Sequence, residues 1–261
     1  MKVVILAGGL GTRISEESHL KPKPMIEIGD QPVLWHIMKY YSYFGFNDFI
    51  ICCGYKGHVI KKYFSDYYLH RSDVTFDFSA ENHMTVHENV VEPWRVTLVY
   101  TGLNTQTGGR IKRIQKYIGD GPFMLTYGDG VSDVDLNALI EQHQDSGKLV
   151  TLTGVQPGGR YGVLDLDETG VSVSGFREKA KEDGGWINGG FMVMESEAFN
   201  YLSAEETCVF EREPLDQLAH DGKRGVYKHS GFWRCMDTQR DRGRLERLWA
   251  NGNAPWKVWD N

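Results

Sequence analysis

The chain has 261 residues, of which 41% are hydrophobic and 25% charged, and its formal net charge is -6. This composition is typical of a soluble globular protein, and the negative charge argues against nucleic-acid binding, which normally needs a basic patch. The four cysteines are too few for a disulfide scaffold, and the adjacent Cys52 and Cys53 do not form a C-x-x-C pair. No stretch reaches the roughly 18 apolar residues of a membrane span, and no signal-peptide pattern is present. We therefore expect a cytoplasmic protein with reduced thiols and no nucleic-acid or membrane partner.

Strands and helices alternate along the first half of the chain. Residues 3–7 and 49–53 are almost entirely apolar, which is the pattern of strands buried on both faces of a parallel sheet. Residues 32–44 carry apolar side chains at helical spacing, and Gly45 can end that helix. A second helix is expected over residues 58–64. The order strand, helix, strand, helix predicts βαβ units.

The alternation continues in the second half, where Ile111, Ile114 and Ile118 fit one helix face. The other elements expected there are a strand over residues 123–127, a helix over 136–143, a strand-rich antiparallel extension over 148–194 and a helix over 238–250. Residues 72–99 alternate like strands and could be a hairpin insertion used for self-association, which predicts a homo-oligomer. No linker interrupts the pattern, so we expect residues 1–261 to form one domain.

A glycine-rich turn over residues 8–13 (GGLGTR) follows the first strand, where α/β sheets bind their ligands. Glycines let the backbone approach a phosphate closely and present N–H groups to it. The dinucleotide motif G-x-G-x-x-G fails because Ile14 replaces the third glycine, and a Walker A motif is absent. Arg13, together with Lys21 and Lys23 in a proline-stiffened stretch, can supply positive charge. The sequence therefore predicts a phosphate-binding loop of another kind.

Residues 6–13 (LAGGLGTR), followed by 23–25 (KPM), resemble the signature of the sugar-1-phosphate nucleotidylyltransferases. Further matches to this family follow in order along nearly the whole chain. They are residues 21–29 (KPKPMIEIG), 35–39 (WHIMK), 51–57 (ICCGYKG), 92–94 (EPW), 107–110 (TGGR), 127–130 (YGDG), 187–191 (INGGF) and 236–238 (MDT). Within the family, these motifs are most similar to those of members that use CTP and glucose 1-phosphate.

The resemblance implies a Rossmann-like mixed sheet flanked by helices, which is the GT-A-like nucleotidyltransferase fold, with a strand-rich sugar-binding extension. It also implies Mg2+-assisted transfer of CMP from CTP to α-D-glucose 1-phosphate, giving pyrophosphate and CDP-glucose for surface polysaccharides such as O-antigen. In-line attack on the α-phosphorus needs positioning and charge neutralisation more than a covalent nucleophile. The alternatives are the same chemistry with dTTP or UTP, a nucleotide-sugar-dependent glycosyltransferase, and a non-catalytic nucleotide-sugar sensor.

The matched motifs imply roles for individual residues on the nucleotide side. Arg13 is expected to clamp the β- and γ-phosphates, and Lys23, rather than Lys21, to contact the α-phosphate. Thr107 can cap the helix that it begins, and Arg110 can reach a nucleotide from that helix. The expected nucleotide-binding residues are Leu6, Ala7, Gly8, Gly9, Leu10, Gly11, Thr12, Arg13, Lys23, Thr107, Arg110 and Gly128.

On the sugar side, the resemblance implies that Lys179 pairs with the sugar phosphate and that Glu178 and Asn188 bond sugar hydroxyls. The expected sugar-phosphate site comprises Gly162, Glu178, Lys179, Asn188 and Gly189. Asp129 and Asp237 each follow an apparent strand, and we expect them to converge on one Mg2+. Without a cation, two acids at close range would repel each other.

Two further patterns suggest metal sites but have structural explanations. Residues 133–135 (DVD) match the metal motif of many glycosyltransferases, but they directly precede a predicted helix, whose first turn favours acidic residues. We therefore expect these aspartates to cap the helix. His83 and His87 have a His-x3-His spacing, but the segment alternates like a strand and has no Glu between them, which argues against zinc.

Overall fold

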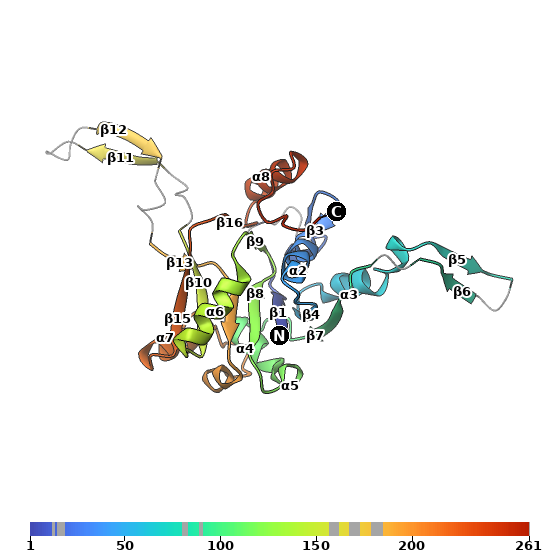
Figure 1. The fold of residues 1–261 in the computed structure, drawn as a ribbon, viewed down its shortest axis with the longest axis horizontal. Coiled ribbons are helices and arrows are strands. Elements are labelled where there is room, and N and C mark those ends of the chain that lie inside the picture. Colours follow the sequence, from blue (N-terminus) through green and yellow to red (C-terminus); the bar gives the residue numbers. More distant parts are fainter. Residues whose placement is uncertain are drawn as a thin grey trace.

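An eight-stranded mixed sheet forms the centre of the molecule (Figure 1). The computed structural model describes residues 1–11, 14, 19–79, 83–88, 91–156, 162–166, 173–178 and 185–260. The strands of the central sheet are β1 (Lys2–Ala7), β4 (Asp48–Cys53), β7 (Arg95–Tyr100), β8 (Phe123–Tyr127), β10 (Val150–Val155), β13 (Ile187–Asn188), β14 (Met192–Met194) and β15 (Arg224–His229). Across the sheet their order is β13, β10, β14, β8, β1, β4 and β7, and β15 also pairs with β10.

The sheet has a parallel part and a mixed part. β1 runs parallel to both β4 and β8, and β4 runs parallel to β7. β14 is antiparallel to β8 and to β10, whereas β10 and β15 are parallel. The extension expected over residues 148–194 therefore includes strands that continue the central sheet. A separate antiparallel hairpin within it consists of β11 (Gly162–Leu166) and β12 (Val173–Glu178).

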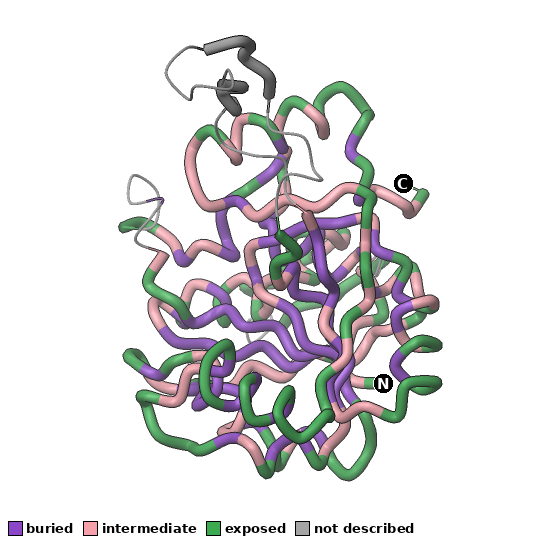
Figure 2. Tube along the Cα trace, turned by 90° about the vertical axis from the view of Figure 1, so that its left-hand side faces the viewer, coloured by how far each residue is buried: buried purple, intermediate pink, exposed green. Residues whose placement is uncertain are grey.

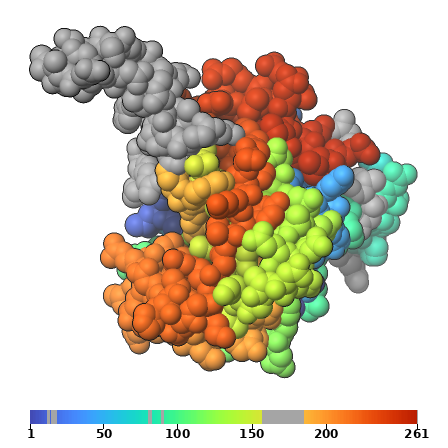
Figure 3. Space-filling view, turned by 60° about the vertical axis from the view of Figure 1, so that its left-hand side comes forward, coloured from blue at the N-terminus to red at the C-terminus, as the bar shows by residue number. Residues whose placement is uncertain are grey.

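Helices cover both faces of the sheet. They are α2 (Val33–Tyr43), α3 (Gly57–Ser65), α4 (Thr107–Arg113), α5 (Gln115–Ile118), α6 (Leu136–Ser146), α7 (Glu213–His220) and α8 (Gln239–Ala250), with 3-10 helices η2 (Lys23–Met25), η3 (Leu69–Arg71) and η5 (Ser196–Tyr201). Val3 and Ile5 pack into the core beneath α2, whereas Val4 and Leu6 face the core beneath α4 and α7. Figure 2 shows the buried strands in the centre of the fold. The edge strand β15 contacts both α6 and α7 and lies between them (Figure 3).

The helix expected to carry three isoleucines is divided in two. Ile114 joins α4 to α5 with a non-helical backbone, although Ile111, Ile114 and Ile118 are all buried as the spacing predicts. The last helix, α8, begins after Thr238, whose hydroxyl and the Asp241 carboxylate form a capping box. None of the described helices has the length and hydropathy needed to cross a membrane.

The segment expected to be a hairpin insertion contains two different structures. β5 (Val74–Asp77) and β6 (His83–Val86) form a hairpin that projects from the body (Figure 1). Residues 95–99, in contrast, belong to β7 at the edge of the central sheet. Phe76 and Phe78 on the hairpin are exposed, which fits a surface for self-association, but a homo-oligomer stays a prediction.

Candidate active site

A pocket of about 300 Å3 lies at the carboxyl ends of β1 and β8. Its lining residues are Leu6, Ala7, Gly8, Gly9, Gly11, Lys23, Pro24, Thr105, Gln106, Thr107, Arg110, Tyr127, Gly128, Asp129 and Asp237. The structure thus brings most of the expected nucleotide-binding residues together from four separate segments of the chain. Leu10 is half exposed and does not line this pocket. Thr12 and Arg13 lie outside the described residues.

Arg110 lies beneath the glycine-rich turn rather than at the surface. Its guanidinium donates hydrogen bonds to the Gly8 carbonyl at 2.9 Å, to the Gly102 carbonyl at 2.8 Å and to the Thr101 hydroxyl at 2.8 Å. A Cβ on Gly8 would lie 2.2 Å from this guanidinium, so only glycine fits above it. The side chain is 4% exposed, and no carboxylate among the described residues pairs with it. Burial lowers the pKa of Arg110, but the group keeps its charge at neutral pH.

The expectation that Thr107 caps α4 is wrong, because Gln106 occupies the N-cap position. The Thr107 hydroxyl instead accepts a hydrogen bond from the Phe210 backbone N–H at 2.9 Å and donates to the Glu211 carboxylate at 2.5 Å. Glu211 also accepts a hydrogen bond from the Tyr127 hydroxyl at 2.6 Å. Thr107 therefore joins α4 to a distant segment of the chain.

Lys23 and Lys21 point to different surroundings. The short helix η2 places the Lys23 ammonium 2.5 Å from Asp129 Oδ2 and 2.7 Å from Asp237 Oδ1. Burial opposes the charge on Lys23, but the attraction of Asp129 and Asp237 outweighs it and raises the pKa of Lys23 above its ordinary value. Lys21 pairs with Glu27 at 2.8 Å and does not line the pocket. This arrangement supports the prediction that selected Lys23 over Lys21.

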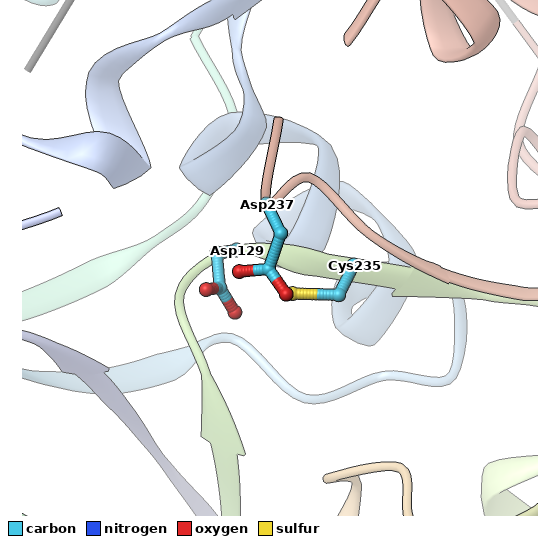
Figure 4. Close-up of side chains that lie close together, drawn as sticks. All are labelled: Asp129, Cys235 and Asp237. Atoms are coloured by element: carbon cyan, nitrogen blue, oxygen red, sulfur yellow. The ribbon is translucent and has the colours of Figure 1, made fainter. Parts of the chain in front are cut away.

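Pairing of two short strands explains why Asp129 and Asp237 meet. β9 (Gly130–Ser132) is antiparallel to β16 (Trp233–Cys235), and the Met236 N–H donates to the Asp129 carbonyl at 2.9 Å. Potential metal-ligand atoms of Asp129, Cys235 and Asp237 consequently lie within 4.8 Å of one another (Figure 4). The repulsion expected between the two acids is offset, because the Lys23 ammonium contacts both carboxylates.

The acidic cluster has the donor set for a hard divalent cation. Carboxylate oxygens suit Mg2+, whereas sulfur suits softer metals. Burial, followed by the charge of Asp129, raises the pKa of the Cys235 thiol, which therefore stays protonated at neutral pH. Asp129 and Asp237 are the two residues that could hold such a cation, with Cys235 as a neighbour.

The two other sequence patterns that suggest a metal site lie outside the acidic cluster. The Asp135 carboxylate caps α6 by accepting hydrogen bonds from the N–H groups of Asn137 and Ala138, as the sequence predicts. The expectation that Asp133 also caps α6 is wrong, because its carboxylate accepts a hydrogen bond from the Phe232 N–H at 2.7 Å and lies 2.8 Å from His229. His83 and His87 are not part of any metal-binding group found among the described residues.

A second pocket, of about 390 Å3, adjoins the acidic cluster, and none of the described residues of the glycine-rich turn lines it. Its lining residues are Thr126, Tyr127, Asp129, Gly130, Asn188, Gly189, Glu211, Trp233, Cys235 and Asp237. Asn188 and Gly189 of the expected sugar-phosphate site are thus placed here. Gly162 and Glu178 are register partners in the β11–β12 hairpin, and Lys179 lies outside the described residues.

Sequence reasoning did not assign Tyr127, Glu211 or Cys235 to the site, although all three line the second pocket. Tyr127 and Cys235 each stand two positions before a predicted metal ligand, so their place at a strand end was a usable signal. Burial, followed by the charge of Glu211, raises the pKa of the Tyr127 hydroxyl, which is therefore protonated at neutral pH. Glu211 follows no strand and matches no motif, so the sequence contained no sign of its position.

Comparison with known proteins agrees with this geometry. A family model described as "Nucleotidyl transferase" matches residues 2–251. The chain is 55% identical over 261 residues to a glucose-1-phosphate cytidylyltransferase of Salmonella typhi, with all of both chains covered. It is 44% identical over 259 residues to a probable glucose-1-phosphate cytidylyltransferase of Bacillus subtilis, which covers 99% of this chain and 100% of that protein.

Solved structures share the fold. The crystal structure of HddC from Yersinia pseudotuberculosis has a TM-score of 0.69 and 25% identity, and it covers 95% of this chain and 99% of that one. A UDP-glucose pyrophosphorylase complexed with UDP-glucose has a TM-score of 0.68, covers 96% of this chain and 98% of that chain, and at 16% identity supports the fold alone. The mixed sheet flanked by helices is therefore the nucleotidyltransferase fold that the sequence predicts. This chain belongs to the nucleotidyl transferase family.

Proposed function

We propose that this protein transfers CMP from CTP to α-D-glucose 1-phosphate and releases pyrophosphate, forming CDP-glucose. The observation that carries the proposal is the meeting of a glycine-rich turn, Lys23, Asp129 and Asp237 in one pocket. The choice of CTP and glucose 1-phosphate is supported by similarity over the full length to glucose-1-phosphate cytidylyltransferases. A separate site for the sugar phosphate is supported by the adjoining second pocket, which Asn188 and Gly189 line.

The nucleotide side is suited to an anion with several phosphates. Gly8, Gly9 and Gly11 line the pocket and allow a triphosphate to approach the backbone closely. The buried Arg110 guanidinium adds positive charge behind the turn and fixes the Gly8 carbonyl. We propose that Arg13 clamps the β- and γ-phosphates, where negative charge develops as pyrophosphate leaves.

We propose that Lys23 neutralises charge at the α-phosphate. It lines the first pocket and contacts Asp129 and Asp237, which line both pockets. In-line displacement gains most from fixed positive charge and from correct orientation of the attacking oxygen. Asp129 and Asp237 would hold Mg2+, which when bound would neutralise phosphate oxygens.

On the sugar side, Asn188 and Gly189 are placed beside the acidic cluster. We propose that Asn188 and Glu178 bond sugar hydroxyls and that Lys179 pairs with the phosphate of glucose 1-phosphate. Binding on this side would orient the phosphate oxygen that attacks the α-phosphorus.

The test is pyrophosphate release with glucose 1-phosphate and Mg2+, measured separately for CTP, UTP, dTTP, ATP and GTP. CTP should give the highest kcat/KM. A clear preference for dTTP or UTP would contradict the choice of CTP but leave the reaction class intact. Hydrolysis or transfer from a nucleotide sugar, with no pyrophosphate released from any NTP, would contradict the reaction class itself.

A further inference from the structure

Four side chains form a hydrogen-bonded chain that joins the two pockets. The Glu211 carboxylate accepts one hydrogen bond on each oxygen, from Tyr127 at 2.6 Å and from Thr107 at 2.5 Å. The Tyr127 oxygen in turn accepts a hydrogen bond from the Asn188 amide at 3.0 Å. A hydroxyl has a single hydrogen to donate, so the carboxylate, which can only accept, fixes the direction of these bonds.

The orientation of the Asn188 side chain follows from these contacts. Its carbonyl oxygen accepts a hydrogen bond from the Gly190 N–H at 3.0 Å, and one amide hydrogen is donated to Tyr127. The second amide hydrogen has no partner among the described residues. Because Asn188 lines the second pocket, this hydrogen is a donor available to a ligand there.

We propose that Glu211 is a positioning residue for the sugar 1-phosphate, acting on Asn188 through the Tyr127 hydroxyl. By accepting the only hydrogen of Tyr127, Glu211 leaves the phenolic oxygen free to accept from Asn188 and so keeps the amide donor directed at the ligand. The inference rests on the proposed function, because it takes a sugar phosphate as the ligand of the second pocket.

The surroundings of Glu211 hold its carboxylate in position to accept the hydrogen bond from Tyr127. Thr107 occupies its other oxygen and is itself held by the Phe210 backbone N–H at 2.9 Å, which limits rotation of the carboxylate. A neutral glutamine would present one acceptor and one donor group, so either Tyr127 or Thr107 would lose its acceptor. Glu211 is also exposed to solvent, so the substitution should cost little stability.

The experiment compares Glu211→Gln, Tyr127→Phe and the double variant, with steady-state kinetics in both substrates. Each single variant should raise KM for glucose 1-phosphate about tenfold, the size expected for one or two lost hydrogen bonds, with kcat and KM for CTP within about twofold of wild type. The double variant should be no worse than the worse single variant, because both changes break the same chain.

Glu213→Gln is the matched control. It removes the same charge two residues away, from an exposed side chain of α7 that contacts Gln217 at 3.4 Å, and should leave all constants unchanged. Thermal unfolding of each variant checks that the fold is retained.

Two results overturn the inference alone, with the wild type active on CTP and glucose 1-phosphate. One is an unchanged KM in Tyr127→Phe, which would mean that Glu211 does not act through the hydroxyl. The other is a double variant whose KM effect is the product of the two single effects, which would mean independent roles. An inactive wild type would instead overturn the proposed function, and the inference with it.

Discussion

The nucleotide side and the sugar side of this site are built from different kinds of contact. On the nucleotide side, buried Arg110 donates hydrogen bonds to backbone carbonyls beneath Gly8, which has no room for a side chain. On the sugar side, Tyr127, Asn188 and Glu211 form hydrogen bonds between partly or fully exposed side chains. Substitutions on the nucleotide side should therefore lower the free energy of unfolding as well as the activity. Substitutions on the sugar side should change substrate affinity with little effect on stability.

The largest expected effect comes from Lys23, which contacts the two aspartates that line both pockets. Lys23→Ala should lower kcat about 100-fold or more, because it removes a fixed positive charge from the transition state. Lys21→Ala is the control, since Lys21 pairs with Glu27 outside the pocket. It should change kcat less than about twofold. Pyrophosphate release under saturating substrates measures both variants, and an equal loss in the two would contradict the assignment of the motif to Lys23.

Asp237→Asn should lower turnover about 10- to 100-fold, with partial recovery at high Mg2+, because one of the two anionic ligands is lost. If repulsion between the two acids were the main effect, the metal-free Asp237→Asn protein would be as stable as the wild type or more stable. In the structure, however, the substitution also removes one of the two carboxylates that pair with Lys23. We now expect a loss of about 1 kcal/mol in the free energy of unfolding.

Two measurements separate these views of Asp237. Urea unfolding in EDTA compares Asp237→Asn with the wild type, and Asp145→Asn, at an exposed position of α6, serves as the control. A stability gain in Asp237→Asn would show that repulsion dominates the acidic cluster. Near-normal turnover and Mg2+ dependence would show that Asp237 holds no metal.

Arg110→Met should mainly affect folding. It preserves much of the side-chain length but leaves the Gly8 and Gly102 carbonyls and the Thr101 hydroxyl without their buried donor. The expected loss is roughly 3 kcal/mol, measured by urea unfolding. Lys116→Met, an exposed change of the same charge on α5, should have no measurable effect on stability. A fully stable Arg110→Met protein with a raised KM for CTP would assign Arg110 to direct nucleotide contact instead.

The sequence predicts much of the nucleotide side because backbone patterns determine it. The apolar run Val3–Ala7, the glycines after it and the acids at strand ends each occupy the position that their pattern predicts. The direction of long side chains depends instead on tertiary neighbours. The sequence therefore could not predict that Arg110 lies beneath Gly8 or that Lys23 pairs with two acids.

The sugar side is less predictable for the same reason. Glu211 approaches Tyr127 and Thr107 only through the tertiary fold, and its own segment has no periodic pattern. Likewise, alternation over residues 72–99 indicates strands but does not separate a projecting hairpin from an edge strand. Strand pairing depends on partners that are distant in the sequence.

The smallest expected effect is a pH dependence of stability that comes from His36, a buried residue close in space to the segment after Lys23. His36 of α2 is fully buried, and its Nε2 lies 2.8 Å from the Ile28 carbonyl in the strand that follows Lys23–Met25. The Trp256 indole N–H donates to Nδ1 at 3.4 Å, so the ring is neutral and Nε2 carries its hydrogen. Burial lowers the pKa of His36 to about 4, against the smaller opposite influence of the Ile28 carbonyl.

The sign of the pH effect follows from where protons bind. Between the ordinary pKa of 6.5 and the folded value of about 4, the unfolded chain binds a proton at His36 and the folded chain does not. The stabilising effect of neutral His36 is thus complete above pH 6.5 and is lost as the pH falls, by about 2 kcal/mol between pH 7 and pH 5.

Urea unfolding at pH 7, 6 and 5 should show this loss in the wild type. His36→Leu should be less stable at pH 7, but its free energy of unfolding should depend less on pH than that of the wild type. If the free energy of unfolding of His36→Leu fell with pH as steeply as that of the wild type, His36 would not be the group that titrates. The loss of stability in acid would then come from carboxylates on the nucleotide side.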